Sequence, residues 1–102
     1  MNEPEAINET ISYQNGAVVS REVVNKSTGT VTLFAFAQNQ GLSEHTTPYD
    51  ALVMVTDGTA EITVAGVKHE VKSGEMLLMP AGSPHALKAL QPFKMLLIMI
   101  KS

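Results

Sequence analysis

The chain has 102 residues, of which 44% are hydrophobic and 17% charged, which is enough for one compact domain and too little for two. Seven Lys and Arg residues against ten Asp and Glu residues give a net charge of -3, so no basic nucleic-acid-binding face is expected. The chain has no cysteine, which excludes disulfides and leaves histidine, carboxylate, carbonyl and water oxygen as donors for any metal ion.

The first ten residues, MNEPEAINET, do not resemble a secretory signal, because they carry three glutamates, no basic residue and no apolar run. We expect a short N-terminal extension, in which only residues 5–11 are able to hold a helical turn. The longest apolar stretch, residues 95–100, has six residues, whereas about 20 are needed to span a bilayer. A cytoplasmic protein with no membrane segment and no nucleic-acid partner is therefore expected.

Short runs rich in β-branched and aromatic residues, separated by turn signals, fill the rest of the chain. The sharpest turn signal is Asp57-Gly58, which is typical of a β-hairpin. Seven or eight short strands at this spacing predict an all-β sandwich or barrel. The expected strands cover residues 17–24, 30–38, 51–56, 59–64, 67–71, 75–79, 85–90 and 93–100.

Two of these strands are apolar on both faces, namely residues 32–37 (TLFAFA) and 93–100 (FKMLLIMI). A strand with one face in water alternates between apolar and polar residues. The second apolar face therefore needs a cover, and in so small a chain a second copy is the simplest one. We expect a homodimer.

The segment from Gly74 to His85 carries the most specific motif in the chain. It reads as glycine, five residues, Pro-x-Gly, two residues and histidine, with Gly74, Pro80, Gly82 and His85 at the defining positions. This motif resembles the second motif of the cupin superfamily, and the chain is similar to its small, single-domain, RmlC-like members. The resemblance implies an antiparallel double-stranded β-helix, or jelly-roll barrel, formed by one domain over residues 1–102 with its motif-bearing core at about 30–100.

The first cupin motif is only partly present, because some of its ligand residues are replaced in this chain. In the family this motif supplies two histidines and a glutamate, and with the histidine of the second motif these resemble a cluster that holds one Fe, Mn, Ni, Zn or Cu ion. Counting along the chain places His45 at the first histidine, Thr47 at the second histidine and Ala51 at the glutamate. His45 and His85 remain as candidate ligands, which is fewer than the two histidines and one carboxylate of a typical non-haem iron centre.

Two residues are candidates to complete such a site. Asp50 has the opposite strand parity to His45, so it joins the site only if Pro48 introduces a bulge; otherwise it caps a turn or faces solvent. His69 shares a strand face with Val71 and would form a three-histidine group with His45 and His85 that suits zinc or copper. The alternative for His69 is a partly exposed strand residue or one near the dimer interface.

The strand period of two predicts the residues that line a pocket inside the barrel. We expect the chain to bind a small molecule there, with or without a divalent metal ion. The alternative is a metal-dependent enzyme of the oxygenase or isomerase type that acts on a small organic substrate, and the fold alone does not decide between these functions. The expected pocket residues are His45, Thr47, Tyr49, Ala51, Val53, His85 and Leu87.

Overall fold

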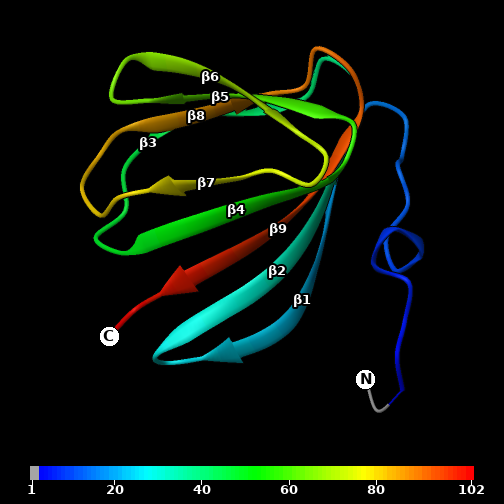
Figure 1. Cartoon of the computed structure of the whole chain (residues 1–102), viewed down its shortest axis with the longest axis horizontal. Helices are drawn as coiled ribbons and strands as arrows, with labels where there is room; N and C mark the ends of the chain where they lie inside the picture. Colours follow the sequence, from blue (N-terminus) through cyan, green and yellow to red (C-terminus); the bar gives the residue numbers. More distant parts are fainter. Residues whose placement is uncertain (1–2) are drawn as a thin grey trace.

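The computed structural model describes residues 3–102, and this part of the chain is almost entirely β-structure (Figure 1). A single 3-10 turn precedes the strands. The elements are η1 (Ile7–Glu9), β1 (Val18–Lys26), β2 (Gly29–Phe36), β3 (Gly41–His45), β4 (Asp50–Asp57), β5 (Thr59–Val64), β6 (Val67–Lys72), β7 (Met76–Met79), β8 (His85–Lys88) and β9 (Phe93–Ile100).

The strands form two sheets that face each other (Figure 1). One sheet has the order β1-β2-β9-β4-β7, and the other has the order β3-β8-β5-β6. All pairs are antiparallel, and the pairs β2–β9 and β3–β8 join segments that lie far apart in the sequence. The all-β, antiparallel jelly-roll barrel expected from the sequence is therefore confirmed.

The strand β3 is the one element that the sequence did not predict. Its sequence, GLSEH, is short, mostly exposed and lacks apolar alternation, so it gives no strand signal by itself. Its main chain nevertheless pairs with β8. The helical turn expected within residues 5–11 is present at Ile7–Glu9, and no helix of residues 3–102 has the length and apolarity needed to cross a membrane.

The hydrophobic core lies between the two sheets. Phe36 on β2 and Phe93 on β9 are both completely buried, and their rings stack with centroids 4.5 Å apart. From β4, Val53 and Val55 point into the same core, while Ile62 on β5 faces them from the second sheet. Every second residue of β4 is buried, namely Ala51, Val53 and Val55. This alternation is expected, because successive side chains of a strand point to opposite faces and one face of β4 points into the core.

The N-terminal segment crosses the outer side of the five-stranded sheet and is anchored at several points. Ile11 is buried against Leu33 and Ala35 of β2. The Tyr13 hydroxyl donates a hydrogen bond to Asp57 Oδ2 at 2.5 Å, and burial together with this carboxylate raises the pKa of Tyr13. This segment therefore covers part of the second apolar face that the sequence analysis identified on the strand at residues 32–37.

Candidate functional site

A β-bulge on β3 turns His45 toward the inside of the barrel. Leu42 lies opposite Leu87 on β8, and His45 lies opposite His85. The chain therefore advances three residues on β3 but only two on β8 between these pairs, so β3 contains one extra residue. On a regular strand, residues three apart point to opposite faces, but the extra residue places Leu42 and His45 on the same face. The bulge thus positions the side chain that the sequence analysis singled out.

His85 reaches the same place from a turn that is tied to the neighbouring loop. The Gly82 N–H donates to the Thr47 carbonyl at 2.8 Å, and the Ala81 N–H donates to Asp50 Oδ1 at 2.8 Å. These bonds hold the 80–84 turn against the loop that joins β3 to β4. His85 is only 4% exposed. It is the first residue of β8 and lies directly opposite His45.

The two imidazole rings meet through their Nε2 atoms, which are 3.0 Å apart. Each Nδ1 atom lies next to a main-chain carbonyl: His45 Nδ1 is 2.7 Å from Ser43 O, and His85 Nδ1 is 3.1 Å from Ser83 O. A carbonyl oxygen only accepts hydrogen bonds, so both Nδ1 atoms carry the hydrogen. In neutral rings both Nε2 atoms then present lone pairs to the same point, where a hydrogen-bond donor or a cation could be held.

Burial lowers the pKa of His85 below its ordinary value of 6.5, because the charged ring loses contact with water. The hydrogen bond to the Ser83 carbonyl opposes this effect, and the neighbouring His45 ring lowers the pKa further. The lowered pKa favours the neutral form of His85 in the folded chain.

This pKa shift predicts an acid-sensitive fold. Because the pKa of His85 is lower in the folded state, the unfolded chain binds more protons there, and stability is lost as the pH falls below about 6.5. Urea unfolding between about pH 7.5 and pH 5.5 should show a falling free energy of unfolding, and His85→Gln should flatten this slope. His69→Gln, which removes a histidine outside the pair, is measured alongside as a control for the loss of one imidazole. An identical slope in the wild type and His85→Gln would contradict the assignment.

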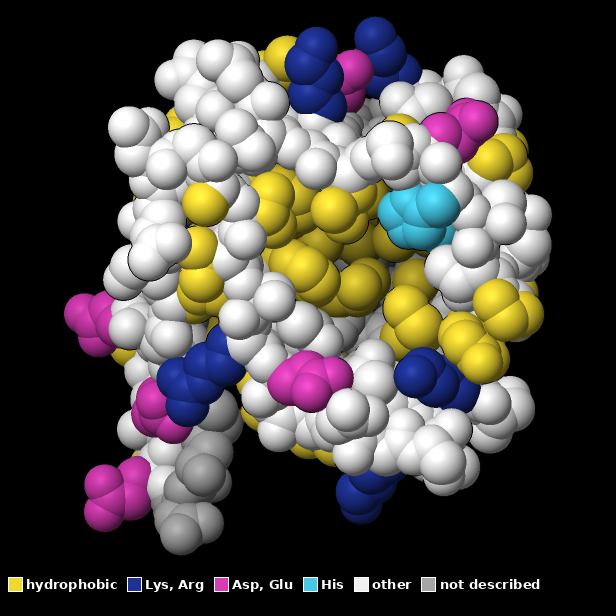
Figure 2. Space-filling view, turned by 180° about the vertical axis from the view of Figure 1, so that it is seen from behind, with side chains coloured by type: hydrophobic (Ala, Val, Ile, Leu, Met, Phe, Trp, Pro, Cys, Tyr) yellow, Lys and Arg dark blue, Asp and Glu magenta, His cyan; other side chains and the backbone are white. Residues whose placement is uncertain are grey.

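Apolar side chains of the four-stranded sheet adjoin the histidine pair without being fully buried. Val64 lies directly opposite His85 on β5, and Leu42 precedes the bulge that carries His45. Figure 2 shows hydrophobic side chains around a hollow on the face seen from behind, with a histidine at its edge. The partly buried residues that pack on the core are Val18, Phe34, Leu42, Val64, Leu77 and Leu97.

The other predicted pocket residues divide into two groups. Ala51, Val53 and Leu87 are buried with their side chains in the core. Thr47 and Tyr49 lie in the loop between β3 and β4, where the Thr47 hydroxyl accepts a hydrogen bond from the Tyr49 N–H at 2.9 Å. Thr47 therefore stabilises a turn at the position where the family pattern has a histidine.

The structure does not bring Asp50 or His69 to the histidine pair. The Asp50 carboxylate caps the Ala81 N–H, which is the turn-capping alternative considered for it. His69 lies opposite Ile62 on β6 and so faces the barrel side of its sheet, as expected, but β5 separates its strand from β8. Within residues 3–102, no three His, Cys, Asp or Glu side chains are placed to hold a metal ion together.

The donor set therefore does not fit a metal ion held by the protein alone. The Nε2 lone pairs of His45 and His85 converge as ligands would, but a typical iron centre needs a third protein donor and a structural zinc site needs four. The residues at the two remaining family positions are Thr47, whose hydroxyl is engaged, and Ala51, which has no donor atom.

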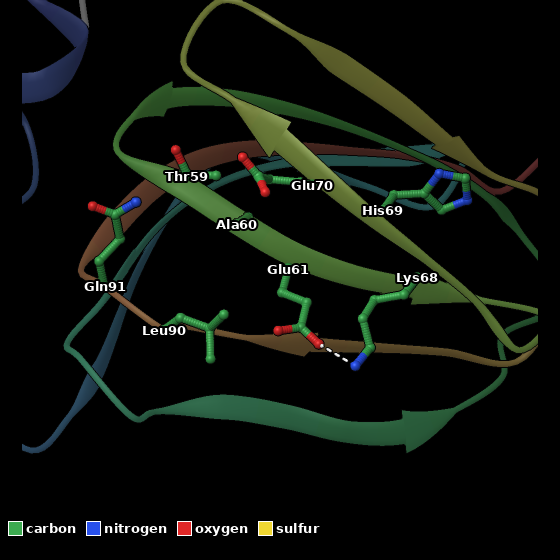
Figure 3. A pocket seen from close by; sticks show the side chains of 8 residues that line it. All are labelled: Thr59, Ala60, Glu61, Lys68, His69, Glu70, Leu90 and Gln91. Carbon is green, nitrogen blue, oxygen red and sulfur yellow. Dashed lines mark ion pairs between the residues drawn. The ribbon is translucent and has the colours of Figure 1, made fainter.

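A second hollow, of about 470 Å³, lies over β5 and β6 on the sheet that carries His69 (Figure 3). Its most prominent polar feature is the ion pair between Lys68 Nζ and Glu61 Oε1, at 3.2 Å. The ring of His69 points away from that ion pair (Figure 3). Lys68 is largely exposed, so the pair contributes little binding energy and the hollow has no converging polar groups comparable to the histidine pair.

Sequence reasoning missed the bulge on β3 and the two carbonyls that fix the rings. One signal was present, because both histidines follow a serine by two residues, as Ser43-Glu44-His45 and Ser83-Pro84-His85. In both cases the histidine Nδ1 contacts the carbonyl of that serine. The shared Ser-x-His spacing thus corresponds to the same local contact at both histidines, between the ring Nδ1 and the serine carbonyl.

Comparison with known proteins agrees with this fold. A family model for the cupin domain matches residues 32–100. The chain is 31% identical to a conserved protein of unknown function from Streptococcus pyogenes, with a TM-score of 0.96 over 100% of this chain and 90% of that one. A cupin superfamily protein from Desulfitobacterium hafniense is 26% identical, with a TM-score of 0.94 over 100% of this chain and 94% of that one.

A cupin 2 conserved barrel domain protein from Leptotrichia buccalis is 40% identical, with a TM-score of 0.88 over 91% of this chain. This chain spans only 45% of that protein's length. A search of curated proteins found no match. Fold and comparisons together define a small jelly-roll barrel protein, and the chain belongs to the cupin family.

Proposed function

We propose that this cupin binds a small organic molecule inside its barrel, with the His45–His85 pair as the polar anchor and without a resident metal ion. The observation that carries the proposal is the convergence of two Nε2 atoms, 3.0 Å apart, beside apolar side chains that are only partly buried. Small-molecule sites commonly combine an apolar wall with a few convergent polar groups.

The two rings contribute differently to such an anchor. His85 is buried and held by Ser83, so it offers a fixed lone pair. His45 is more exposed, which makes its Nε2 the atom that a ligand entering from solvent meets first. A ligand hydroxyl that donates to one of these lone pairs would replace the contact between the rings.

A metal-dependent enzyme, which the family resemblance raised as the alternative, would need donors beyond these two rings. Cupins often bind metal ions, but in this chain Thr47 and Ala51 replace two of the family's ligands. We therefore expect ligand binding to persist in the presence of a chelator such as EDTA. Binding that needs an added transition metal would favour the enzyme alternative.

Histidine-selective NMR tests the proposal directly, because the chain has only three histidines. Protein labelled at histidine is assigned with His45→Gln, His85→Gln and His69→Gln and then mixed with a library of small organic acids, alcohols and sugars in the presence of EDTA. We expect at least one compound to shift the ring signals of both His45 and His85 while His69, the internal control, stays unchanged. Compounds that bind but shift only His69, or neither ring of the pair, would overturn the proposal.

We also propose that two copies of this chain form a homodimer. The support comes from the outer side of the five-stranded sheet, where large apolar side chains such as Met76 and Leu78 are exposed. A soluble domain rarely leaves a contiguous apolar patch uncovered. Light scattering at micromolar concentration tests the mass, and a monomer throughout that range would contradict the homodimer.

A further inference from the structure

A lysine and a tyrosine end the barrel-facing side of the five-stranded sheet. Ala51 on β4 lies opposite Met99 on β9, and Ala51 is part of the core, so both side chains face the barrel. Tyr49 precedes Ala51 by two residues, and Lys101 follows Met99 by two residues. Because the strand period is two, the same register places Tyr49 and Lys101 beside each other on the barrel side, one residue pair beyond the strand ends.

Two contacts show that the pairing continues to this point. The Lys101 N–H donates to the Thr28 carbonyl at 2.8 Å, which extends the pairing of Ile100 with Gly29 by one residue. The Lys101 Nζ atom lies over the Tyr49 ring, 5.6 Å from its centroid. The main chain of Lys101 is thus fixed by the β1–β2 turn, and its ammonium group is held by the tyrosine ring.

The ammonium group of Lys101 has no carboxylate partner in the described part of the chain. Within residues 3–102 the one ion pair joins Lys68 to Glu61 on the other sheet. Lys101 is partly buried, whereas Lys68 is exposed. A positioned ammonium group forms charge-assisted hydrogen bonds, which are stronger than neutral ones. The rim of the barrel therefore holds a cation that is free to bind an anionic group.

The same rim carries the histidine pair. The loop with Tyr49 begins at His45, and residues four apart along a chain are separated by at most about 14 Å. The hydrogen bond between the Tyr49 N–H and the Thr47 hydroxyl turns this loop and shortens the separation. Lys101 and the histidine pair belong to opposite sheets, and packed sheets lie ~10 Å apart.

Apolar side chains extend from Lys101 into the barrel. Met99 and Leu97 follow it on the same face of β9, and Leu97 is only partly buried against the core. Figure 2 shows Lys or Arg side chains close to the hydrophobic hollow that a histidine borders. A cation, an apolar wall and two imidazole lone pairs thus follow one another around one opening.

We infer that Lys101, held by Tyr49, binds the carboxylate of the ligand, and that the ligand carries this carboxylate at one end and a hydroxyl group at the other. The hydroxyl donates to the Nε2 lone pairs of the His45–His85 pair, and an apolar segment between the two groups lies against Met99. This inference rests on the ligand-binding function proposed above and names the chemical class of the ligand.

The acidic residues near this face do not occupy the position of Lys101. Asp50 alternates to the other side of β4, where its carboxylate accepts a hydrogen bond from the Ala81 N–H. Glu22 does face the barrel, in the same cross-strand row as Leu97, but it is exposed and lies two strands from β9. At ~4.8 Å per strand and ~3.3 Å per residue, Glu22 and Lys101 are roughly 16 Å apart, about twice the distance over which physiological salt screens a charge.

Three compounds of equal chain length test the inference, namely 6-hydroxyhexanoate, 1,6-hexanediol and 6-amino-1-hexanol. Each is titrated into protein labelled at histidine, and the ring signals of His45 and His85 report binding. We expect the hydroxy acid to bind about fivefold more tightly than the diol, and the amino alcohol to bind most weakly. Lys101→Gln should lower the affinity for the hydroxy acid to that for the diol and leave the affinity for the diol unchanged.

Two further variants sharpen the test. Lys101→Glu should reverse the order, so that the amino alcohol binds more tightly than the hydroxy acid. Lys88→Gln is the matched control, because it removes the same charge from an exposed position on the outer side of the four-stranded sheet and should keep the wild-type order. Far-UV circular dichroism checks that the variants fold, and the order of the three compounds on the wild type decides if Lys101→Gln does not.

The outcomes separate this inference from the proposed function. Equal affinities of the wild type for the hydroxy acid and the diol, or a preference for the acid that Lys101→Gln keeps, would overturn the role of Lys101. Shifts at both rings would still support binding at the histidine pair. If none of the three compounds shifts either ring, this ligand class is overturned, and the wider library described above decides the proposed function separately.

Discussion

Phe36→Ala is expected to lower the free energy of unfolding by about 3–5 kcal/mol. Phe36 is completely buried, and its ring stacks on Phe93 at a centroid distance of 4.5 Å, so the truncation removes a large apolar contact and leaves a cavity between the sheets. Phe36 lies directly opposite Phe93 in the β2–β9 pair, so the loss also weakens the contact between these two strands. Urea unfolding monitored by far-UV circular dichroism measures the effect.

Phe34→Ala is the matched control for this substitution. Phe34 lies two residues away on the same strand and on the same side, but it is only partly buried, and its ring lies 5.9 Å from that of Phe36. We expect a clearly smaller loss of stability, because solvent already reaches part of the ring. Equal losses for the two variants would show that Phe34 is as well packed as Phe36 and would contradict its partly buried position.

Most of the fold could be predicted because its signals are local. Asp57-Gly58 separates β4 from β5, and Gly58 has a positive φ of 71°. The β-hairpin expected there is wrong, because β4 and β5 belong to different sheets and the turn carries the chain from one sheet to the other. The expected strands at 59–64 and 93–100 match β5 and β9 closely. The strand β3 escaped prediction since its pairing with β8 is set by tertiary contacts and not by the pattern of GLSEH.

The candidate site was predictable in its residues and not in its geometry. Motif spacing singled out His45 and His85, and the structure places their Nε2 atoms 3.0 Å apart. Counting strand parity through to Asp50 assumed a continuous strand, whereas the chain leaves β3 at His45 and enters β4 at Asp50. The bulge lies before His45, and not at Pro48, because the mismatch in register falls between Leu42 and His45.

Alternation on β4 and β9 places apolar side chains on both sides of the five-stranded sheet. One side of these strands carries Val53 and Leu97 toward the barrel, and the other side carries Leu52 and Ile98 toward the outer side of the sheet. This arrangement explains why the segment at 93–100 is apolar on both faces.

We expect a low content of transition metal because of the donor set at the histidine pair. Two imidazoles converge, the hydroxyl of Thr47 is engaged with Tyr49, and Ala51 has no donor atom. Two protein donors are fewer than the two histidines and one carboxylate of a typical non-haem iron centre, so we expect a transition metal ion to bind weakly.

Elemental analysis by plasma mass spectrometry, on untagged protein purified without added metal, tests this account most directly. His45→Gln and His85→Gln, which remove one donor each, are measured alongside the wild type. We predict transition-metal contents far below one ion per chain in all three proteins. One equivalent of iron, manganese, nickel, zinc or copper in the wild type that both variants lose would contradict the account and establish a metal centre at the histidine pair.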